Sequence, residues 1–459
     1  MKTPSHKKKE LYTSIASSFF FPLHERIKNH HSVAVRKELE ASQWWDQTRL
    51  QELQLSRLIR LLTHAEVHVP YYRKLFSEIG FEVEDVRSLT DLARLPLLDK
   101  SKIRVNTDAL KSENAQSLHR FNTGGSSGEP LIFYIGKERV THDVAAKWRA
   151  TRWWDVDIGD REMVVWGSPI ELGAQDFVRT LRDRLFRTRL LPAFEMSEKK
   201  LDGFLEEICT MRPKMLFGYP SALSHIARHA EATGRHMDDL GIRVAFVTSE
   251  RLYDEQRQQI SKTFACPVAN GYGGRDAGFI AHECQQGGMH VTAEDIIVEI
   301  VDQAGAPLPC GKAGEIVVTH LATKDFPFIR YRTGDIGALD SRPCVCGRGL
   351  PILKEIQGRS TDFLVARDGT IVHGLALIYV LRDMPQIRSF KIIQESLELT
   401  RVWVVGEAAL SLEVTTKIEQ GFKARLGYAV NIVIEQMAEI PAEKSGKFRY
   451  VVSKVAMAG

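Results

Sequence analysis

A regular alternation of short β-rich runs with amphipathic stretches occupies the middle of the chain, and it constrains the fold more than any other feature. The β-rich runs include Glu162–Trp166, Val244–Thr248 and Glu315–Thr319, and amphipathic stretches run over Glu198–Met211 and Ser221–Thr233. Strands that alternate with helices usually belong to α/β layers with substantial parallel pairing. We therefore predict an α/β fold of layered sheets and helices.

The two ends of the chain have sequence patterns that differ from the strand–helix alternation of the middle. Residues 1–95 read as a mainly helical leader, in which Leu50–Ala65 repeats leucines at three- and four-residue spacing, as one buried helical stripe does. Beyond about residue 360 the predicted elements are a strand at Ser389–Gln394, a strand at Thr400–Val405, a helix near Thr415–Leu426 and a strand at Ala429–Glu435. We predict an N-terminal domain over residues 1–360 and a small α+β domain over residues 361–459.

The charge balance argues against a nucleic-acid binder. The net charge of +4 comes from 62 basic and 58 acidic residues, without the excess of cations that carries such binding. No run approaches the roughly 20 apolar residues of a membrane span. The apolar run Ile15–Leu23 follows Lys7–Lys9 but is short and lacks a small-residue cleavage site, so it is a poor signal peptide. We expect a cytoplasmic protein and leave weak contact with a membrane surface open.

The segment Asn122–Leu131 is the most informative local pattern, with the sequence Asn-Thr-Gly-Gly-Ser-Ser-Gly-Glu-Pro-Leu. Its glycines let backbone N–H groups converge on an anion, and its hydroxyl side chains add donors suited to phosphate oxygens. It is not a Walker A loop, because the Gly-Lys-Ser/Thr ending is absent. By itself it is equally well read as a flexible surface turn.

Three further motifs follow in order along the chain. They are Asn270–Gly278, then Arg330–Gly337 followed by Gly358–Asp362, and finally Pro441–Arg449. Each has a simpler interpretation when it is taken alone: a turn at a strand end, a hairpin turn and a solvated lysine-rich end.

Taken together, the four motifs resemble those of the adenylate-forming superfamily. The chain is similar to the phenylacetate–CoA ligase branch, which includes CapK-like and coenzyme F390 synthetase-like members. The resemblance begins near His64–Arg73 and Leu95–Lys100, passes through Gly218–Ser221 and ends at Ser445–Lys447, so it covers nearly the whole chain. It implies a large N-terminal adenylate-forming domain with a small C-terminal lid.

The resemblance also implies the chemistry. ATP would activate a carboxylic acid as an acyl-adenylate with release of pyrophosphate, and the acyl group would then pass to CoA. Lys447, Asp276 and Arg359 would be the catalytic residues, with Lys447 bridging the substrate carboxylate and the α-phosphate. The implied nucleotide-binding residues are Thr123, Gly124, Gly125, Ser126, Ser127, Gly128, Ser249, Glu250, Arg251, Gly271, Tyr272, Gly273, Asp335, Arg359 and Lys447. Asp335 would accept hydrogen bonds from both ribose hydroxyls.

Asp276 departs from the family pattern. Glu commonly stands at this position as the Mg²⁺ ligand, and Asp is one methylene shorter, whereas Mg²⁺ demands tight octahedral geometry. The resemblance also makes Asp362 the hinge about which the lid would turn between half-reactions, although an ordinary turn carboxylate would look the same.

The six cysteines do not form a disulfide framework in a chain of 459 residues. The close pair Cys344 and Cys346 favours metal ligation, and the resemblance adds Cys284 and His290 as partners. Three thiolates and one imidazole would close a tetrahedral structural zinc site with no position for water. His282 is an alternative ligand, and buried reduced thiols are the alternative without metal.

The expected substrate pocket is aromatic. It comprises Trp166, Phe217, Gly218, Tyr219 and Gly274, which favour a flat apolar acid, although Trp166 and Phe217 also suit a core. CoA is the default acceptor. Two alternatives stay open, namely transfer to an amine or hydroxyl in a secondary-metabolite or polysaccharide pathway, and a nucleotide-binding regulator without turnover. ATP, Mg²⁺, zinc, CoA and a small carboxylic acid are the expected ligands, and a homodimer is left open.

Overall fold

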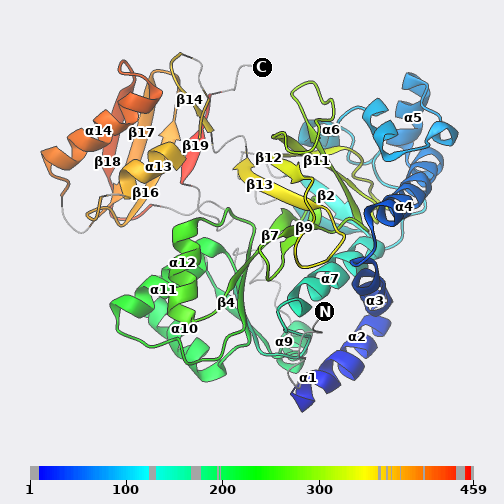
Figure 1. Cartoon of the computed structure of the whole chain (residues 1–459), viewed down its shortest axis with the longest axis horizontal. Coiled ribbons are helices and arrows are strands. Elements are labelled where there is room, and N and C mark those ends of the chain that lie inside the picture. Colours follow the sequence, from blue (N-terminus) through cyan, green and yellow to red (C-terminus); the bar gives the residue numbers. More distant parts are fainter. Residues whose placement is uncertain are drawn as a thin grey trace. The chain divides into compact units, whose positions relative to one another are not determined.

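The computed structural model describes residues 10–122, 131–166, 177–193, 196, 198–359, 363–368, 371–373, 375–382, 384–406, 409–440 and 450–455. The chain divides into two compact units. The first comprises Met1–Thr333 and Gly337–Ile356, and the second comprises Gly334–Ile336 and Gln357–Gly459 (Figure 1).

Helices dominate the first hundred described residues. They are α1 (Leu11–Ile15), the π-helical η1 (Ala16–Phe20), α2 (Phe21–Ile27), α3 (Ser32–Ser42), α4 (Gln47–His68), α5 (Pro70–Ile79), the short 3₁₀ helices η2 (Val83–Asp85) and η3 (Leu89–Arg94), and α6 (Lys100–Val105). Helix α4 contains the predicted leucine repeat and buries Leu50, Leu58, Leu61 and Leu62. It begins where the Asp46 side chain accepts a hydrogen bond from the Arg49 N–H, which satisfies one free donor of the first turn.

One sheet of 11 strands organises the first unit, in the order β10-β11-β12-β13-β9-β8-β7-β6-β5-β3-β4. Its strands are β3 (Glu162–Trp166), β4 (Thr188–Pro192), β5 (Met215–Gly218), β6 (Val244–Thr248), β7 (Val268–Gly274), β8 (Gly278–Glu283), β9 (Met289–Val291), β10 (Ile296–Val301), β11 (Gly314–His320), β12 (Tyr331–Asp340) and β13 (Ile352–Arg359). A separate antiparallel hairpin joins β1 (His119–Asn122) to β2 (Ile132–Ile135).

The half of this sheet from β4 to β7 is parallel, which confirms the predicted α/β fold. Successive side chains on a strand point to opposite faces, so each strand contributes to two cores. On one face Leu216 and Val247 pack with α10 (Glu198–Met211) and α11 (Pro220–Ala232). On the other face Phe217 and Phe246 belong to the core that also includes the N-terminal helices. Figure 1 shows α10, α11 and α12 (Asp254–Phe264) together in green.

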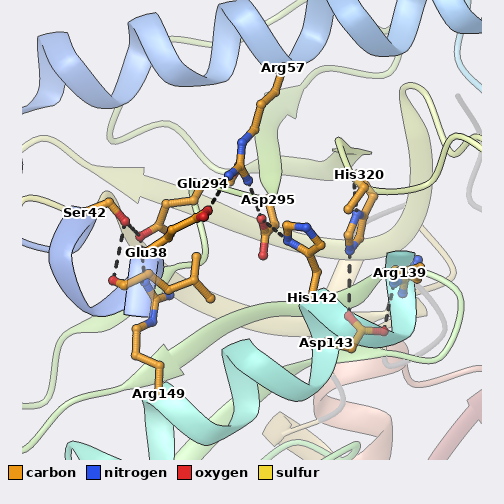
Figure 2. Close-up of polar contacts among 12 residues, drawn as sticks. Glu38, Ser42, Arg57, Arg139, His142, Asp143, Arg149, Glu294, Asp295 and His320 are labelled. Atoms are coloured by element: carbon orange, nitrogen blue, oxygen red, sulfur yellow. Dashed lines mark hydrogen bonds and ion pairs between the residues drawn. The ribbon is translucent and has the colours of Figure 1, made fainter. Parts of the chain in front are cut away.

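The first unit also contains α9 (Phe177–Leu185). Helix α7 (Lys137–Arg152) is unusual because its buried side includes charged residues (Figure 2). Arg149 donates to the Glu294 carboxylate at 2.7 Å, and both side chains are only 1% exposed. Ser42 on α3 donates to the same carboxylate oxygen at 2.7 Å. This pair therefore ties α3 and α7 to the turn before β10.

Two further groups extend this network along α7 (Figure 2). His142 contacts Asp295 at 2.7 Å, and Arg57 on α4 donates to the same Asp295 oxygen at 2.7 Å. Burial opposes ionisation of Asp295, but the nearby His142 and Arg57 charges hold the pKa of its carboxyl below the usual range. One turn earlier, Arg139 donates to Asp143 at 2.8 Å. Helix α7 is thus held to α4 by paired charges in the interior.

The second unit is a small α+β fold, as predicted. It contains the antiparallel pair β14 (Phe363–Val365) and β15 (Ile371–His373), the helices α13 (Leu375–Arg382) and α14 (Leu412–Leu426), and a sheet of β16 (Ser389–Gln394), β17 (Leu399–Val405), β18 (Asn431–Gln436) and β19 (Val451–Ser453). The sheet order is β18-β17-β16-β19. Helix α14 begins three residues before the predicted start because Ser411 accepts from the Val414 N–H and caps it.

Among the described helices, none combines the length and the apolar run that a transmembrane segment needs.

Arg149→Ala should destabilise the protein by about 3–5 kcal/mol, because it leaves the Glu294 carboxylate buried without its partner. The measurement is urea unfolding followed by circular dichroism. The matched control is Arg73→Ala, which breaks the exposed Arg73–Glu113 pair and should leave the urea midpoint nearly unchanged, because water screens an exposed pair. Equal losses in the two variants would contradict the importance of the buried pair.

Candidate active site and metal centre

The carboxyl ends of the parallel strands bring several predicted residues to one edge of the sheet. Strand β3 ends at Trp166, β5 ends at Gly218, and β6 ends at Thr248, which lies opposite Gly271 on β7. In open α/β sheets, ligands bind outside this edge. The predicted substrate and nucleotide residues on these strands therefore start from a common edge.

Aromatic rings line part of this edge. The Trp166 ring stacks on Tyr219, with 4.3 Å between ring centroids, and lies 6.0 Å from Phe217. Phe217 and Tyr219 are buried, whereas Trp166 is only partly buried. A Cβ at Gly218 would lie 2.3 Å from the Val165 carbonyl oxygen, so only glycine allows β3 and β5 to approach this closely.

The segment after β6 turns sharply at Ser249, whose φ of 71° lies in the left-handed region. Glu250 then accepts a hydrogen bond from the Ser221 N–H at 3.3 Å, at the first turn of α11. Burial, together with the Glu250 charge, raises the pKa of Tyr219 above its ordinary value. Arg251 follows and lies over the Tyr253 ring at 5.4 Å. The predicted nucleotide-binding segment at residues 249–251 is thus attached to α11 and to the aromatic edge.

The motif that contains Tyr272 and Asp276 forms a tight hairpin between β7 and β8, with an irregular register between Tyr272 and Gly273. Gly274 is the last residue of β7, and Asp276 lies in the turn. The Asp276 carboxylate accepts from the Tyr331 hydroxyl at 2.7 Å and from the Ala277 N–H at 3.1 Å. Because each carboxylate oxygen can accept more than one bond, the group keeps lone pairs for a cation.

Tyr272 makes a second link between the same two motifs, since its hydroxyl donates to Thr333 at 3.5 Å. Asp276 and Tyr331 are 55 residues apart in sequence, and Tyr272 and Thr333 are 61 apart. The structure therefore brings the second and third sequence motifs together. Asp335 follows on the same strand, β12.

Arg330 explains why β12 starts where it does. Arg330 is 2% exposed, and its guanidinium forms a bidentate pair with Glu299 at 3.0 and 3.1 Å. It also donates to the Leu95 carbonyl at 2.6 Å. Leu98 donates its N–H to the Arg330 carbonyl and accepts from the Arg332 N–H, both at 2.9 Å. The predicted Leu95–Lys100 segment is therefore the backbone partner of the Tyr331 strand.

The sequence motifs do not include Arg139, and Tyr331 lies within the Arg330–Gly337 motif without a predicted role of its own. Arg139 is 2% exposed and donates to the backbone carbonyls of Arg275 at 3.3 Å and Asp276 at 3.4 Å, so it holds the hairpin turn. The only local signal is Asp143 four residues later, which pairs with Arg139. Such a pair normally indicates an exposed helix face.

Several predicted site residues lie outside the described residues. These are Thr123, Gly124, Gly125, Ser126, Ser127 and Gly128 of the glycine-rich loop, the hinge candidate Asp362 and the catalytic candidate Lys447. Arg359 is the last residue of β13.

A second group of predicted residues converges at the other end of β8. The donor atoms of Cys284, His290, Cys344 and Cys346 all lie within 4.8 Å of one another. The Cys284 and Cys344 sulfurs are 3.7 Å apart, and His290 Nε2 lies 3.2 Å from the Cys346 sulfur. His282 is not a member of this group, and its ring stacks on Phe279 instead.

The chemistry of this group suits a bound metal. His290 Nδ1 donates to the Leu350 carbonyl at 3.2 Å, which leaves Nε2 with its lone pair facing the thiols. Burial lowers the pKa of His290 to about 4, so the imidazole is neutral. A Cβ at Gly288 would lie 2.7 Å from the Cys344 sulfur and 3.2 Å from His290 Nε2. Glycine at this position therefore keeps space around the donors.

Comparison with known proteins identifies the family. Residues 189–322 match the family described as AMP-binding enzyme, and residues 364–454 match the CapK C-terminal domain. The chain belongs to the adenylate-forming superfamily. The AMP-binding match includes the whole Asp276 hairpin, and the CapK match coincides with most of the second compact unit.

Relatives of this adenylate-forming chain align over most of its length. It is 23% identical to protein CapK of Staphylococcus aureus, over 97% of this chain and 96% of that protein. It is 25% identical to the phenylacetate–coenzyme A ligase of Thermus thermophilus, over 88% of this chain and 96% of that protein. The crystal structure of 2-hydroxyisobutyryl-CoA ligase in its postadenylation state has the same fold, with a TM-score of 0.72 at 22% identity and coverage of 90% and 91%.

Proposed function

We propose that the protein is an AMP-forming acid–CoA ligase. It would condense a carboxylic acid, most simply an aromatic one, with ATP to give an acyl-adenylate and pyrophosphate, and would then transfer the acyl group to CoA. The observation that carries the proposal is the meeting of two superfamily motifs at Asp276, whose carboxylate is held by Tyr331. A relative named phenylacetate–coenzyme A ligase supports the acid and the acceptor.

The chemistry explains the residue types that this activity needs. A carboxylate is a poor electrophile, and joining it to the α-phosphate of ATP supplies AMP as a good leaving group. Two anions must be brought together while charge is redistributed, so catalysis depends on positioning and on electrostatic stabilisation. In the proposal Asp276 holds Mg²⁺, Asp335 orients the ribose, and Lys447 bridges the two reacting anions. Arg359 supports the nucleotide, and Asp362 is the hinge.

A different acceptor is the second candidate. The match of residues 364–454 to the CapK C-terminal domain and the alignment with CapK over 97% of this chain keep it open, because the name of that relative, unlike that of the phenylacetate–coenzyme A ligase, does not include CoA. An amine or hydroxyl would then replace CoA in the second step, while adenylation stays unchanged.

ATP, CoA and reduced thiols all favour a cytoplasmic location. A homodimer remains a prediction.

Lys447→Ala should lower acid-dependent ATP–pyrophosphate exchange by about 10²–10³-fold, because a preorganised cation facing the transition state is lost. The assay uses a panel of aryl and alkyl carboxylic acids with the purified protein. ATP binding, followed by equilibrium dialysis, should change little. Lys454→Ala is the matched control, because this exposed lysine pairs with Glu395 instead.

Three outcomes separate the candidates. Thioester formation on addition of CoA supports the ligase, and exchange without thioester but with hydroxamate on addition of hydroxylamine supports another acceptor. No exchange with any acid, together with intact ATP binding, would make the protein a nucleotide-binding regulator and would contradict both. Near-normal exchange in Lys447→Ala would contradict the role of that lysine.

Tyr331→Phe should raise the Mg²⁺ concentration needed for half-maximal exchange by about five- to ten-fold, because one hydrogen bond that orients Asp276 is lost. Asp276→Asn should raise it further, since the anionic ligand itself is removed. Tyr134→Phe is a matched control, because that ring lies over Lys111 and not at the hairpin. An unchanged Mg²⁺ dependence in both site variants would exclude Asp276 as the metal ligand.

We also propose that Cys284, His290, Cys344 and Cys346 hold a structural zinc ion. Protein purified without chelators should contain about one zinc per chain by elemental analysis. Cys346→Ser should lower the zinc content and the unfolding temperature, whereas Cys310→Ser, at an exposed cysteine, should change neither. If the wild-type protein contains no zinc and unfolds at the same temperature as the Cys346→Ser variant, the group is a cluster of reduced thiols.

A further inference from the structure

The helical rod α1–η1–α2 exposes a continuous line of large apolar side chains. Leu11, Ile15, Phe19, Leu23 and Ile27 follow one another at four-residue intervals and are 79%, 41%, 62%, 47% and 77% exposed. Single exposed apolar residues need no explanation. Here, however, five of the thirteen large apolar side chains exposed among the described residues lie in 17 consecutive residues. We call this feature the apolar line.

The other side of the rod is anchored to the protein. Ala16 and Phe21 are buried, and the Phe21 ring packs edge-on against Trp148 at 4.9 Å and Phe186 at 5.6 Å. The Tyr12 hydroxyl donates to the Leu185 carbonyl at 2.8 Å. The rod is therefore fixed in orientation by its inner side.

The π-helical segment in the middle of the rod keeps the line together. In an α-helix a spacing of four residues drifts by about 40° at each step, which would spread five side chains around the rod. Residues Ala16–Phe20 form η1, and its wider turn partly reverses this drift. The resulting line runs for about 24 Å along the rod.

Positive charge is concentrated in the same part of the sequence. Residues 1–31 contain six of the 62 Lys and Arg residues but only two of the 58 Asp and Glu residues, which leaves 56 of each sign in the rest of the chain. The whole net charge of +4 is therefore carried by this segment.

The two acidic residues of the segment are both engaged by protein groups. Glu10 pairs with Arg187 at 3.1 Å, and Glu25 is 3% exposed and bonded to Ser32 and His24. Arg26 and Lys28, by contrast, are exposed beside the end of the line.

We propose that the apolar line docks on an anionic membrane surface, with the rod lying in the plane of the interface. An apolar side combined with flanking cations is the pattern of helices that bind at a lipid interface. A second copy of the chain would bring the same excess of positive charge against itself, which opposes self-association through this face.

The test is co-sedimentation of the full chain with two kinds of vesicle, phosphatidylcholine alone and phosphatidylcholine with about a quarter phosphatidylglycerol. At about 0.1 M salt the anionic vesicles should bind the protein at least about ten-fold more tightly, and about 0.5 M salt should weaken this binding. Phe19→Ser with Leu23→Ser should weaken binding to the anionic vesicles at least about ten-fold. Val105→Ser with Leu412→Ser is the matched control, at residues 82% and 83% exposed, and should bind normally.

Three results would overturn the proposal. The first is equal binding to the two kinds of vesicle, and the second is an equal loss of binding to the anionic vesicles in both double variants. The third is a wild-type dimer that becomes a monomer in the Phe19→Ser, Leu23→Ser variant by light scattering, which would identify a second copy as the occupant. Unchanged unfolding midpoints and unchanged pyrophosphate exchange without vesicles establish that the variants are folded.

Discussion

Both side chains of the Arg149–Glu294 ion pair are buried, and with Ser42 the pair joins helices α3 and α7 to the turn before β10. Charges removed from water must be paired, so neither α7 nor the turn before β10 can shift without a large penalty. Near the other end of α7, Arg139 binds the backbone of the hairpin turn that carries Asp276. One helix therefore connects the interior of the unit to the position of a candidate catalytic carboxylate.

Strand β8 connects the two predicted sites. The Asp276 turn precedes its first residue, Gly278, and Cys284 follows its last residue. A metal bound by the cysteines and His290 would cross-link this end of the hairpin to the 344–346 segment, because its ligands come from both. In such an arrangement the metal would contribute rigidity, and Asp276, the candidate Mg²⁺ ligand, would lie at the opposite end of the same strand.

Local patterns predicted much of the fold. The predicted strands Glu162–Trp166, Val244–Thr248 and Ser389–Gln394 and the helix Glu198–Met211 have the same bounds in the structure. The partners of the site residues were not predictable in this way, because Asp276 and Tyr331 are 55 residues apart in sequence, with several strands between them. Arg139 was missed for a related reason: a charged residue in a helical pattern reads as facing water.

The sequence by itself determined the alternation of strands and helices, the order of the motifs and the residue types available for anion and metal binding, since these depend on spacing along the chain. Only the tertiary structure decided that Tyr331 holds Asp276, that Arg149 and Glu294 are buried, and that the four zinc-ligand candidates meet without His282. Such contacts depend on the register between distant strands, which no local pattern specifies.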